Sequence, residues 1–228
     1  MAIKYHYDVE QNTDSWLNLR LGILTGSNIN RIVTGAGKPA KNASMREYAA
    51  ELAAQRITKR GEGNFQSYAM MMGHIQEDVA RDIYSENYAP VKQCGFITND
   101  EYGFTMGCSP DGLVGENALI EIKSRMAKFQ VVTIIADEMD KLFTNQVQGN
   151  LLISGRDYAD FIQYSTGLPF FVKRIDIDHV RREMIVEAMI AFEAEVERTK
   201  EEFLDKAASM VQTEWIDFSD DGEIEVSD

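Results

Sequence analysis

The order of the segments predicts an α/β protein of α+β type, in which a central mixed β-sheet is flanked by helices. Helical patterns come first, strand patterns cluster in the middle of the chain, and helices, two further strands and a long helix follow. A hydrophobic content of 44 % with 10 % aromatic residues is sufficient for a packed core. No apolar run approaches the ~18 residues of a membrane span, so we expect no membrane partner.

The first elements of the chain are helical, and a glycine-containing loop follows them. Segment 15–33 reads as a helix interrupted at Gly26, where Thr25 or Ser27 is expected to cap a new helix. Loop 34–42 precedes no lysine-serine signature of a phosphate-binding loop, so the sequence does not favour a nucleotide site there.

Two longer helices follow this loop. A capping box at Ser44 and Glu47 predicts the start of a helix that extends to Arg60. A second helix is expected over residues 67–88. Its apolar residues at helical spacing predict a buried stripe made of Met72, Ile75, Val79 and Ile83.

The second half of the chain combines strands and helices. Strands are expected at 91–98, 103–108, 118–123, 158–164 and 170–177, and helices at 129–136 and 144–153. Asp178 is expected to cap a long final helix. The buried face of that helix is predicted to contain Ile185, Met189, Phe192, Val196 and Phe203.

Charge is distributed unevenly along the chain. A net charge of −14 argues against a protein that coats nucleic acid with a basic surface, but it allows a nuclease that keeps a few cations in a groove. Residues 1–213 are expected to form one domain, and residues 214–228 an acidic tail with seven acids and no base. Because apolar residues are interleaved in the tail, we expect residues 215–218 to contact a neighbouring subunit or a partner; a solvated terminus is the alternative.

The N-terminus and the cysteines indicate the cellular location and exclude some kinds of site. The first residues lack the apolar block of a secretory signal, so we expect a cytoplasmic protein. Cys94 and Cys108 are too few for a disulfide framework or for a four-thiolate zinc or iron–sulfur centre.

The residues that carry chemistry gather around one strand. Alternation places Glu121 and Lys123 on one face of strand 118–123, with the intervening isoleucines toward the core. Asp111, in a Pro-Asp-Gly turn, comes to lie beside Glu121 if the two segments pair. Two carboxylates and an ammonium at one point suit Mg²⁺-dependent hydrolysis of a phosphodiester. The alternative is an exposed edge strand beside an ordinary turn.

Two helical motifs add polar groups to this constellation. Glu77 is able to aim a third carboxylate at the metals, and a surface ion pair with Arg81 is its alternative. Gln146 and Gln148 supply amides on a predicted helix, although they would also suit an ordinary polar surface.

A third motif suits a phosphate group. Arg20 offers a guanidinium, Thr25 and Ser27 offer hydroxyls, and a helix start offers backbone N–H groups. The alternative is a capped helix with an incidental arginine.

In this order the motifs resemble those of the phage lambda exonuclease family, within the PD-(D/E)-x-K nuclease superfamily. The family pattern has a Trp, an Arg and a Gly leading to Thr-x-Ser, then Gly-x3-Glu, Ser-Pro-Asp-Gly-Leu, Glu-x-Lys and Gln-x-Gln. The match extends over residues 16–152, and the last third of the chain agrees only in layout. Ser124 stands where the family has a cysteine, and Gly26 replaces a common alanine; we expect neither change to alter the chemistry. The resemblance implies a restriction-endonuclease-like core.

The resemblance also implies a role for each motif residue. Asp111, Glu121 and the backbone carbonyl of Ile122 would bind metal, and Glu77 would join them directly or through water. The catalytic residues would be Glu77, Asp111, Glu121, Lys123 and Gln146. Lys123 would position or activate the attacking water, and Gln146 would orient that water or the scissile phosphate.

DNA contacts follow from the same resemblance. Arg20, Ser27 and Ser109 would form the pocket for the 5′-phosphate. Met70 would be an apolar wedge that splits the terminal base pair, with ordinary core packing as its alternative.

The implied function is a Mg²⁺-dependent exonuclease, with two metal ions per site and Mn²⁺ as an alternative metal. It would degrade the 5′-ended strand of linear duplex DNA processively and leave a 3′ overhang. The resemblance implies a ring-shaped homotrimer and a single-strand annealing protein as partner in phage or prophage recombination, in a bacterial cytoplasm. The basic residues expected to face the channel are Lys41, Arg46, Arg56, Lys59 and Arg60. A restriction- or repair-type endonuclease of the same superfamily and a catalytically silent DNA-end-binding protein are the alternatives.

Overall fold

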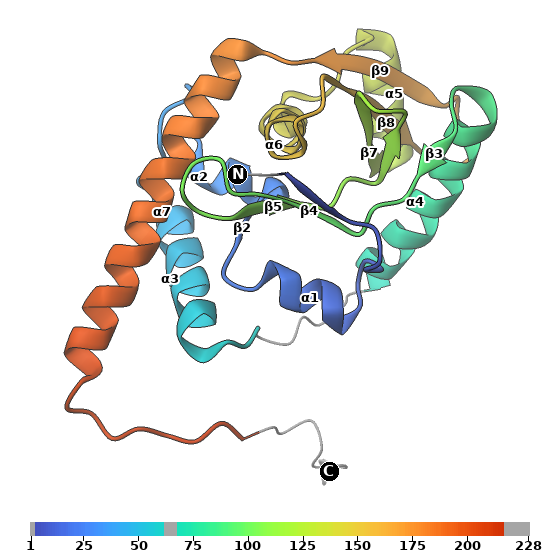
Figure 1. Cartoon of the computed structure of the whole chain (residues 1–228). Coiled ribbons are helices and arrows are strands. Elements are labelled where there is room, and N and C mark those ends of the chain that lie inside the picture. Colours follow the sequence, from blue (N-terminus) through green and yellow to red (C-terminus); the bar gives the residue numbers. More distant parts are fainter. Residues whose placement is uncertain (1–2, 62–67, 217–228) are drawn as a thin grey trace, which may run out of the picture.

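Two β-sheets organise the computed structural model, which describes residues 3–61 and 68–216 without the side chains of residues 68–71 (Figure 1). The first sheet has the order β1-β4-β5-β2 and contains β1 (Lys4–His6), β2 (Leu24–Thr25), β4 (Phe96–Asn99) and β5 (Met106–Cys108). The second has the order β3-β6-β7-β8-β9 and contains β3 (Val91–Lys92), β6 (Gly112–Val114), β7 (Ala118–Ser124), β8 (Tyr158–Tyr164) and β9 (Phe171–Asp176). Both sheets are mixed, because β2 pairs with β5 and β7 with β8 in parallel.

Helices surround and separate these sheets. They are α1 (Asp14–Arg20), the 3-10 helix η1 (Gly26–Asn28), α2 (Ile29–Ile32), α3 (Ala43–Thr58), α4 (Tyr68–Asn87), α5 (Ala127–Ala136), the 3-10 helix η2 (Lys141–Phe143), α6 (Thr144–Ser154) and α7 (His179–Ala207). The predicted class, mixed sheet with flanking helices, is confirmed. The strands are nevertheless divided between two sheets, because the segment from Ser109 to Asp111 carries the chain from β5 in one sheet to β6 in the other.

Helix α6 lies between the two sheets and contacts β4 and β5 of the first and β8 of the second (Figure 1). Every residue from Val147 to Ser154 is buried. Close packing explains Gly149, since a Cβ there would lie 1.8 Å from Cδ1 of Ile29. This helix therefore presents its polar side chains to the interior of the protein.

Helices α3 and α7 pack against each other at one edge of the molecule (Figure 1). Tyr48 stacks on Phe192 with ring centroids 5.0 Å apart. Arg56 donates to Glu193 and Glu197 at 2.6 and 2.7 Å and, through Nε, to the backbone oxygen of Gly22 at 2.8 Å. These bonds tie Arg56 into the packing of α3 against α7.

The buried face of α4 differs from the predicted stripe. Ile75 and Val79 are 52 % and 43 % exposed, whereas Ala80 and Tyr84 are buried. The reason is that the Tyr84 hydroxyl donates to Asp160 of β8 at 2.5 Å, which turns that side of the helix toward the sheet.

Helix ends agree only in part with the predictions. The α3 cap is Asn42, whose Oδ1 accepts from the backbone N–H of Met45 at 2.9 Å, so the capping box at Ser44 is wrong. Asp178 caps α7 as predicted. Phe203 is 54 % exposed, not buried, because the end of α7 projects beyond α3 (Figure 1). No helix in the described ranges is both long and apolar enough to cross a bilayer.

Candidate active site

The turn that joins the two sheets brings Asp111 against strand β7. Strands β6 and β7 pair antiparallel, with Gly112 opposite Ile120. Immediately before β6, Asp111 Oδ2 accepts a 2.6 Å hydrogen bond from the backbone N–H of Ile122. The two segments pair as the sequence analysis requires, so Asp111 lies beside the strand that carries Glu121 and Lys123.

Glu121 is buried and held by three donors. Its Oε1 accepts from Gln146 Nε2 at 2.6 Å and lies 2.7 Å from Lys123 Nζ. Its Oε2 accepts from Asn150 Nδ2 at 2.8 Å. Strand β7 lies between β6 and β8, so the alternative of an exposed edge strand is excluded.

Glu77 belongs to the same electrostatic cluster. Its Oε2 lies 3.5 Å from Nδ1 of His74, one helical turn earlier on α4. Arg81 instead contacts Asp78 at 2.5 Å and donates through Nε to the backbone oxygen of Asp111 at 2.7 Å. The alternative surface pair of Glu77 with Arg81 is therefore wrong, and Arg81 fastens the Asp111 turn to α4.

Crowded carboxylates change the acid–base properties of the site. Burial, followed by the charges of Glu121 and Glu77, raises the pKa of Asp111 well above its usual range. Burial likewise raises the pKa of Glu77. Burial lowers the pKa of Lys123, but the neighbouring Glu121 and Asp111 outweigh it and raise that pKa to about 12. Asp111 and Glu77 therefore hold their protons more tightly than free carboxylic acids do in the metal-free site.

The donors that gather here are hard oxygens. Among the described residues, no three His, Cys, Asp or Glu side chains form a ready-made metal cluster. Asp111 and Glu121 converge as a pair beside the backbone of Ile122. Such a set fits Mg²⁺, which proteins commonly bind through one or two carboxylates while water and substrate oxygens complete its coordination.

A second cluster forms around Arg20 at the end of α1. Its guanidinium carbon lies 3.9 Å from the centroid of the Trp16 ring, and NH1 donates to Ser109 Oγ at 3.4 Å. Trp16 Nε1 donates to the same Oγ at 2.8 Å. Burial lowers the pKa of Arg20, and no carboxylate among the described residues pairs with it. A stacked guanidinium without a carboxylate partner is suited to an anion.

The structure joins only part of the predicted phosphate pocket. Arg20 and Ser109 are in contact, and Ser109 immediately precedes the turn of Asp111. Ser27 is exposed and lies 3.3 Å from the hydroxyl of Thr25, but no contact links it to Arg20 or Ser109 in the described part of the chain. The side chain of Met70, the predicted wedge, lies outside the described residues.

Two residues that bond within these clusters, Asn150 and Trp16, were not assigned a role by the sequence analysis. Asn150 follows Gln146 by four residues on α6, so helical spacing alone would have placed both amides on one face. Trp16 occurs in the phosphate motif, but nothing in the sequence shows that its indole N–H bonds Ser109. Gln148, in contrast, binds the backbone of Asp176 and Asp178 and so has a structural role.

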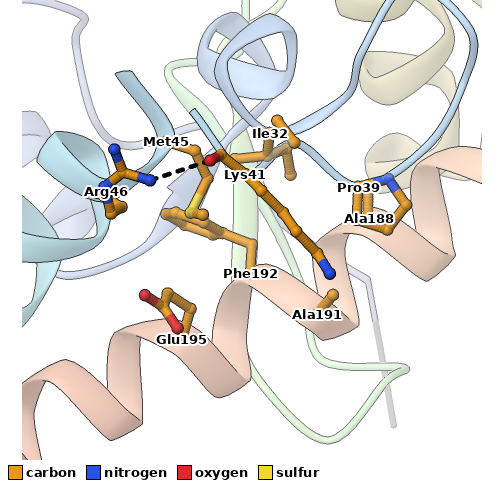
Figure 2. Close-up of a pocket in the computed structure, with 10 residues that line it drawn as sticks. Ile32, Pro39, Lys41, Met45, Arg46, Ala188, Ala191, Phe192 and Glu195 are labelled. Atoms are coloured by element: carbon orange, nitrogen blue, oxygen red, sulfur yellow. Dashed lines mark hydrogen bonds between the residues drawn. The ribbon is translucent and has the colours of Figure 1, made fainter. Parts of the chain in front are cut away.

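A separate hollow of about 270 Å³ lies between the start of α3 and the middle of α7 (Figure 2). Apolar side chains such as Phe192 form its floor, and Arg46 at its rim donates to the backbone oxygen of Lys41 at 2.9 Å. None of the predicted catalytic or phosphate-binding residues lines it.

Comparison with known proteins adds a family and a fold. Residues 15–157 match the model of the YqaJ-like viral recombinase domain. The crystal structure of LHK-Exo, an alkaline exonuclease from Laribacter hongkongensis, is 33 % identical, with 87 % of this chain and 100 % of that chain covered at a TM-score of 0.76. LHK-Exo in complex with dAMP matches with a TM-score of 0.77 at the same identity and coverage.

A more distant structure shares the fold. A phage related exonuclease from Haemophilus somnus 129PT matches with 15 % identity and a TM-score of 0.55, over 82 % of this chain and 98 % of that chain. None of the curated proteins compared with the chain matches it. The resemblance to the lambda exonuclease family and the restriction-endonuclease-like fold class are thereby confirmed.

Proposed function

Because this chain belongs to the family of YqaJ-like viral recombinase domains, we propose that it is a metal-dependent exonuclease that degrades the 5′-ended strand of linear duplex DNA. The observation that carries the proposal is the convergence of Asp111, Glu121 and Lys123 where the two sheets meet. LHK-Exo supports it, because that 33 % identical protein is an alkaline exonuclease. Its complex with dAMP supports a site that holds a nucleoside monophosphate.

The carboxylates form the proposed metal site. Asp111, Glu121 and the carbonyl of Ile122 would hold Mg²⁺ or Mn²⁺, two ions in each site, with Glu77 joining directly or through water. The metal, when bound, supplies Lewis-acid activation of water and of the scissile phosphate. The protein supplies a prearranged carboxylate, since Gln146, Lys123 and Asn150 already fix both oxygens of Glu121.

Lys123 serves as a fixed cation in this proposal. Glu121 and Asp111 raise the pKa of Lys123 to about 12, so in the metal-free protein its ammonium keeps its proton at neutral and mildly alkaline pH. It therefore acts as a hydrogen-bond donor to the attacking water or to the charge that develops on the phosphate, not as a base. Gln146, beside it on Glu121 Oε1, would orient that water or the phosphate. Water attacks phosphorus and loses a proton to solvent, the bond to the 3′-oxygen breaks, and that oxygen takes up a proton from solvent. A 5′-mononucleotide with a free 3′-hydroxyl leaves, and the shortened strand keeps a new 5′-phosphate.

Recognition of the 5′ end is assigned to the Arg20 cluster. Arg20 and Ser109 would bind the terminal phosphate, since the guanidinium has no carboxylate partner in the described residues and Ser109 is adjacent in sequence to the Asp111 turn. Ser27 would join them by a movement of its exposed side chain, and Met70 would split the end base pair. Processive loss of the 5′-ended strand leaves a 3′ overhang suited to an annealing protein.

Exposed apolar side chains support a homo-oligomer, which we propose is a ring-shaped trimer around DNA. On α5, Gln130 and Thr133 are the buried residues, whereas Val132 and Ile135 are 65 % and 80 % exposed. Exposed apolar faces of this kind commonly mark interfaces. Residues 1–213 would form the nuclease domain, and the tail 214–228 would serve subunit or partner contacts.

Cleavage of linear and closed circular DNA tests the proposal. The purified protein with Mg²⁺ should release mononucleotides from linear duplex DNA and leave a closed circle intact, and a chelator should stop the reaction. Nicking or linearisation of the circle would favour an endonuclease. Binding to ends without release of nucleotides in Mg²⁺ or Mn²⁺ would favour a silent end-binding protein.

A further inference from the structure

We propose that Asn150 is a positioning residue for Glu121 and that Gly26 provides the space in which it does so. The amide of Asn150 would hold Oε2 of Glu121 at the back of the site, so that Oε1 stays directed at Lys123 and Gln146. This inference rests on the proposed function, because Glu121 is taken there as a metal ligand.

The geometry of α6 makes this arrangement possible. Gln146 and Asn150 are four residues apart, so both amides lie on the face of the helix that meets β7. Gln146 binds Oε1 at 2.6 Å, whereas Asn150 binds Oε2 at 2.8 Å. Asn150 and Glu121 are each only 2 % exposed, so bulk water does not replace the bond between them.

The unused oxygen of Asn150 favours a functional role over a packing role. Its Oδ1 is buried and has no hydrogen-bond donor among the described residues. Buried acceptors without a donor are uncommon, and a position that served only packing would favour an apolar side chain. Turning the amide over would set Oδ1 against Oε2 of Glu121, which places two acceptors together. The hydrogen bond to Oε2 of Glu121 thus selects the observed orientation of the amide.

Gly26 lies directly against the amide of Asn150. A Cβ on Gly26 would lie 1.9 Å from Oδ1 of Asn150 and 3.3 Å from Cβ of Cys108. The backbone of Gly26 does not itself require glycine, because this residue is not among those with positive φ. The glycine therefore makes room for the side chain of Asn150, and under this proposal its replacement of the family's common alanine does bear on the site, contrary to the expectation from the sequence.

Variants of Asn150 separate positioning from structure. Asn150→Ala removes the donor, and Asn150→Asp replaces it by an acceptor of the same shape. Changes at residues that hydrogen-bond a metal ligand commonly reduce metal affinity or activity by about 10- to 100-fold. We expect a loss of that size in kcat for Asn150→Ala, with KM for DNA within about threefold, and a larger loss for Asn150→Asp. Calorimetry without DNA should show weaker Mn²⁺ binding for both variants.

Gln148→Ala is the matched control. Gln148 is a buried amide on the same helix, but it binds the backbone of Asp176 and Asp178. Its loss should lower the melting temperature without changing Mn²⁺ affinity or the Mg²⁺ concentration for half-maximal activity. If both Asn150 variants behave like Gln148→Ala, with lower melting temperature and unchanged metal response, the inference is wrong.

A double-mutant cycle tests the match with Gly26. Gly26→Ala should reduce kcat and Mn²⁺ affinity, because its methyl group displaces the amide. In the Asn150→Ala background the same methyl group has room, so Gly26→Ala should cause little further loss. Equal losses in both backgrounds would overturn the role of Gly26.

The failure of this inference is distinguishable from failure of the proposed function. A wild-type protein without metal-dependent hydrolysis of linear DNA contradicts the proposed function. An active wild type, together with Asn150→Ala and Asn150→Asp that match it in kcat and Mn²⁺ affinity, contradicts only the role of Asn150. Should the alanine variant fail to fold, the isosteric Asn150→Asp decides the question by the same two readouts.

Discussion

The carboxylate of Asp111 accepts a 2.6 Å hydrogen bond from the backbone N–H of Ile122, one residue from both Glu121 and Lys123. This bond fastens the turn between the sheets to the strand that carries the other charged groups. It also leaves Oδ1 of Asp111 free of donors among the described residues. Segment 121–123 therefore fixes the position of the Asp111 carboxylate and also carries the charged groups nearest to it.

Asp111→Asn should stabilise the metal-free protein at alkaline pH. The pKa of Asp111 is raised in the folded state, so its favourable contribution is fully present below its unfolded pKa of about 3.9 and is lost as pH rises through the folded pKa. The amide keeps an acceptor for Ile122 but removes the repulsion by Glu121 and Glu77. At pH 8 in chelator we expect Asp111→Asn to melt a few degrees above wild type. In a chain of this size, each kcal/mol added to the free energy of unfolding raises the melting temperature by about 2–4 °C.

Addition of Mg²⁺ should reverse the order of the melting temperatures of wild type and Asp111→Asn. Mg²⁺ binds the folded wild type and raises its melting temperature, whereas Asp111→Asn should gain little. In chelator, the difference in melting temperature between the two proteins should shrink as the pH is lowered toward 4. A variant that melts below wild type at pH 8 in chelator would contradict the assigned repulsion.

Lys123→Ala should abolish cleavage but not metal binding. Removal of a preorganised donor at a developing charge commonly costs about 100-fold or more in kcat. An ammonium is no metal ligand, so calorimetry should show Mg²⁺ uptake at least as strong as in wild type, in contrast to Asp111→Asn. Near-normal cleavage by either variant would remove the site from the account.

Arg20→Ala should act selectively on phosphorylated ends. The guanidinium is stacked on Trp16 and bonded to Ser109, so it is prearranged for a charge-assisted contact with phosphate. Initial rates should fall far more on duplex with a 5′-phosphate than on duplex with a 5′-hydroxyl. Arg198→Ala, which removes an arginine paired on the surface of α7, is the control for loss of charge. Equal losses on both substrates would mean that Arg20 is structural.

Val132→Asp and Ile135→Asp should dissociate the oligomer. Both side chains are exposed in the single chain, so each protomer should fold, while a buried unpaired carboxylate would oppose association. Light scattering after size-exclusion chromatography should show a lower mass. Val180→Asp, at a site 63 % exposed on α7, is the comparison. An unchanged mass for both α5 variants would exclude this helix from the interface.

Truncation after Thr213 tests the tail. Trp215 lies with its ring 4.8 Å from the guanidinium carbon of Arg60 and is 56 % exposed, and residues 217–228 lie outside the described ranges. We expect reduced oligomer mass or reduced binding to the annealing protein. If mass, DNA digestion and binding all stay unchanged, the tail hypothesis is wrong.

The centre of the site could be predicted from sequence because its geometry is local. Asp111 immediately precedes β6, which forms a hairpin with the strand β7 that carries Glu121, and alternation relates Glu121 to Lys123. Asn150 was accessible in principle from its spacing to Gln146. On a helix buried all round, however, periodicity does not reveal which face meets the carboxylate.

Errors arose where packing depends on distant elements. Apolar residues at helical spacing in α4 indicated a buried stripe, yet Tyr84 and its bond to Asp160 turn Ile75 and Val79 outward. The division into two sheets escaped prediction because β2 and β3 are two residues long and carry no readable alternation. The capping box at Ser44 is wrong because Asn and Ser cap helices about equally well, and Asn42 stands two residues earlier, where α3 begins.

The most direct test of the central claim uses linear duplex DNA labelled on one strand at a time, with and without a 5′-phosphate. With Mg²⁺, the account predicts that label on the 5′-ended strand is released as mononucleotides, that the complementary strand persists as a 3′ overhang, and that a 5′-phosphate accelerates the reaction. It also predicts no release by Asp111→Asn. Degradation that starts at the 3′ end, or cleavage that persists in Asp111→Asn, would contradict the account.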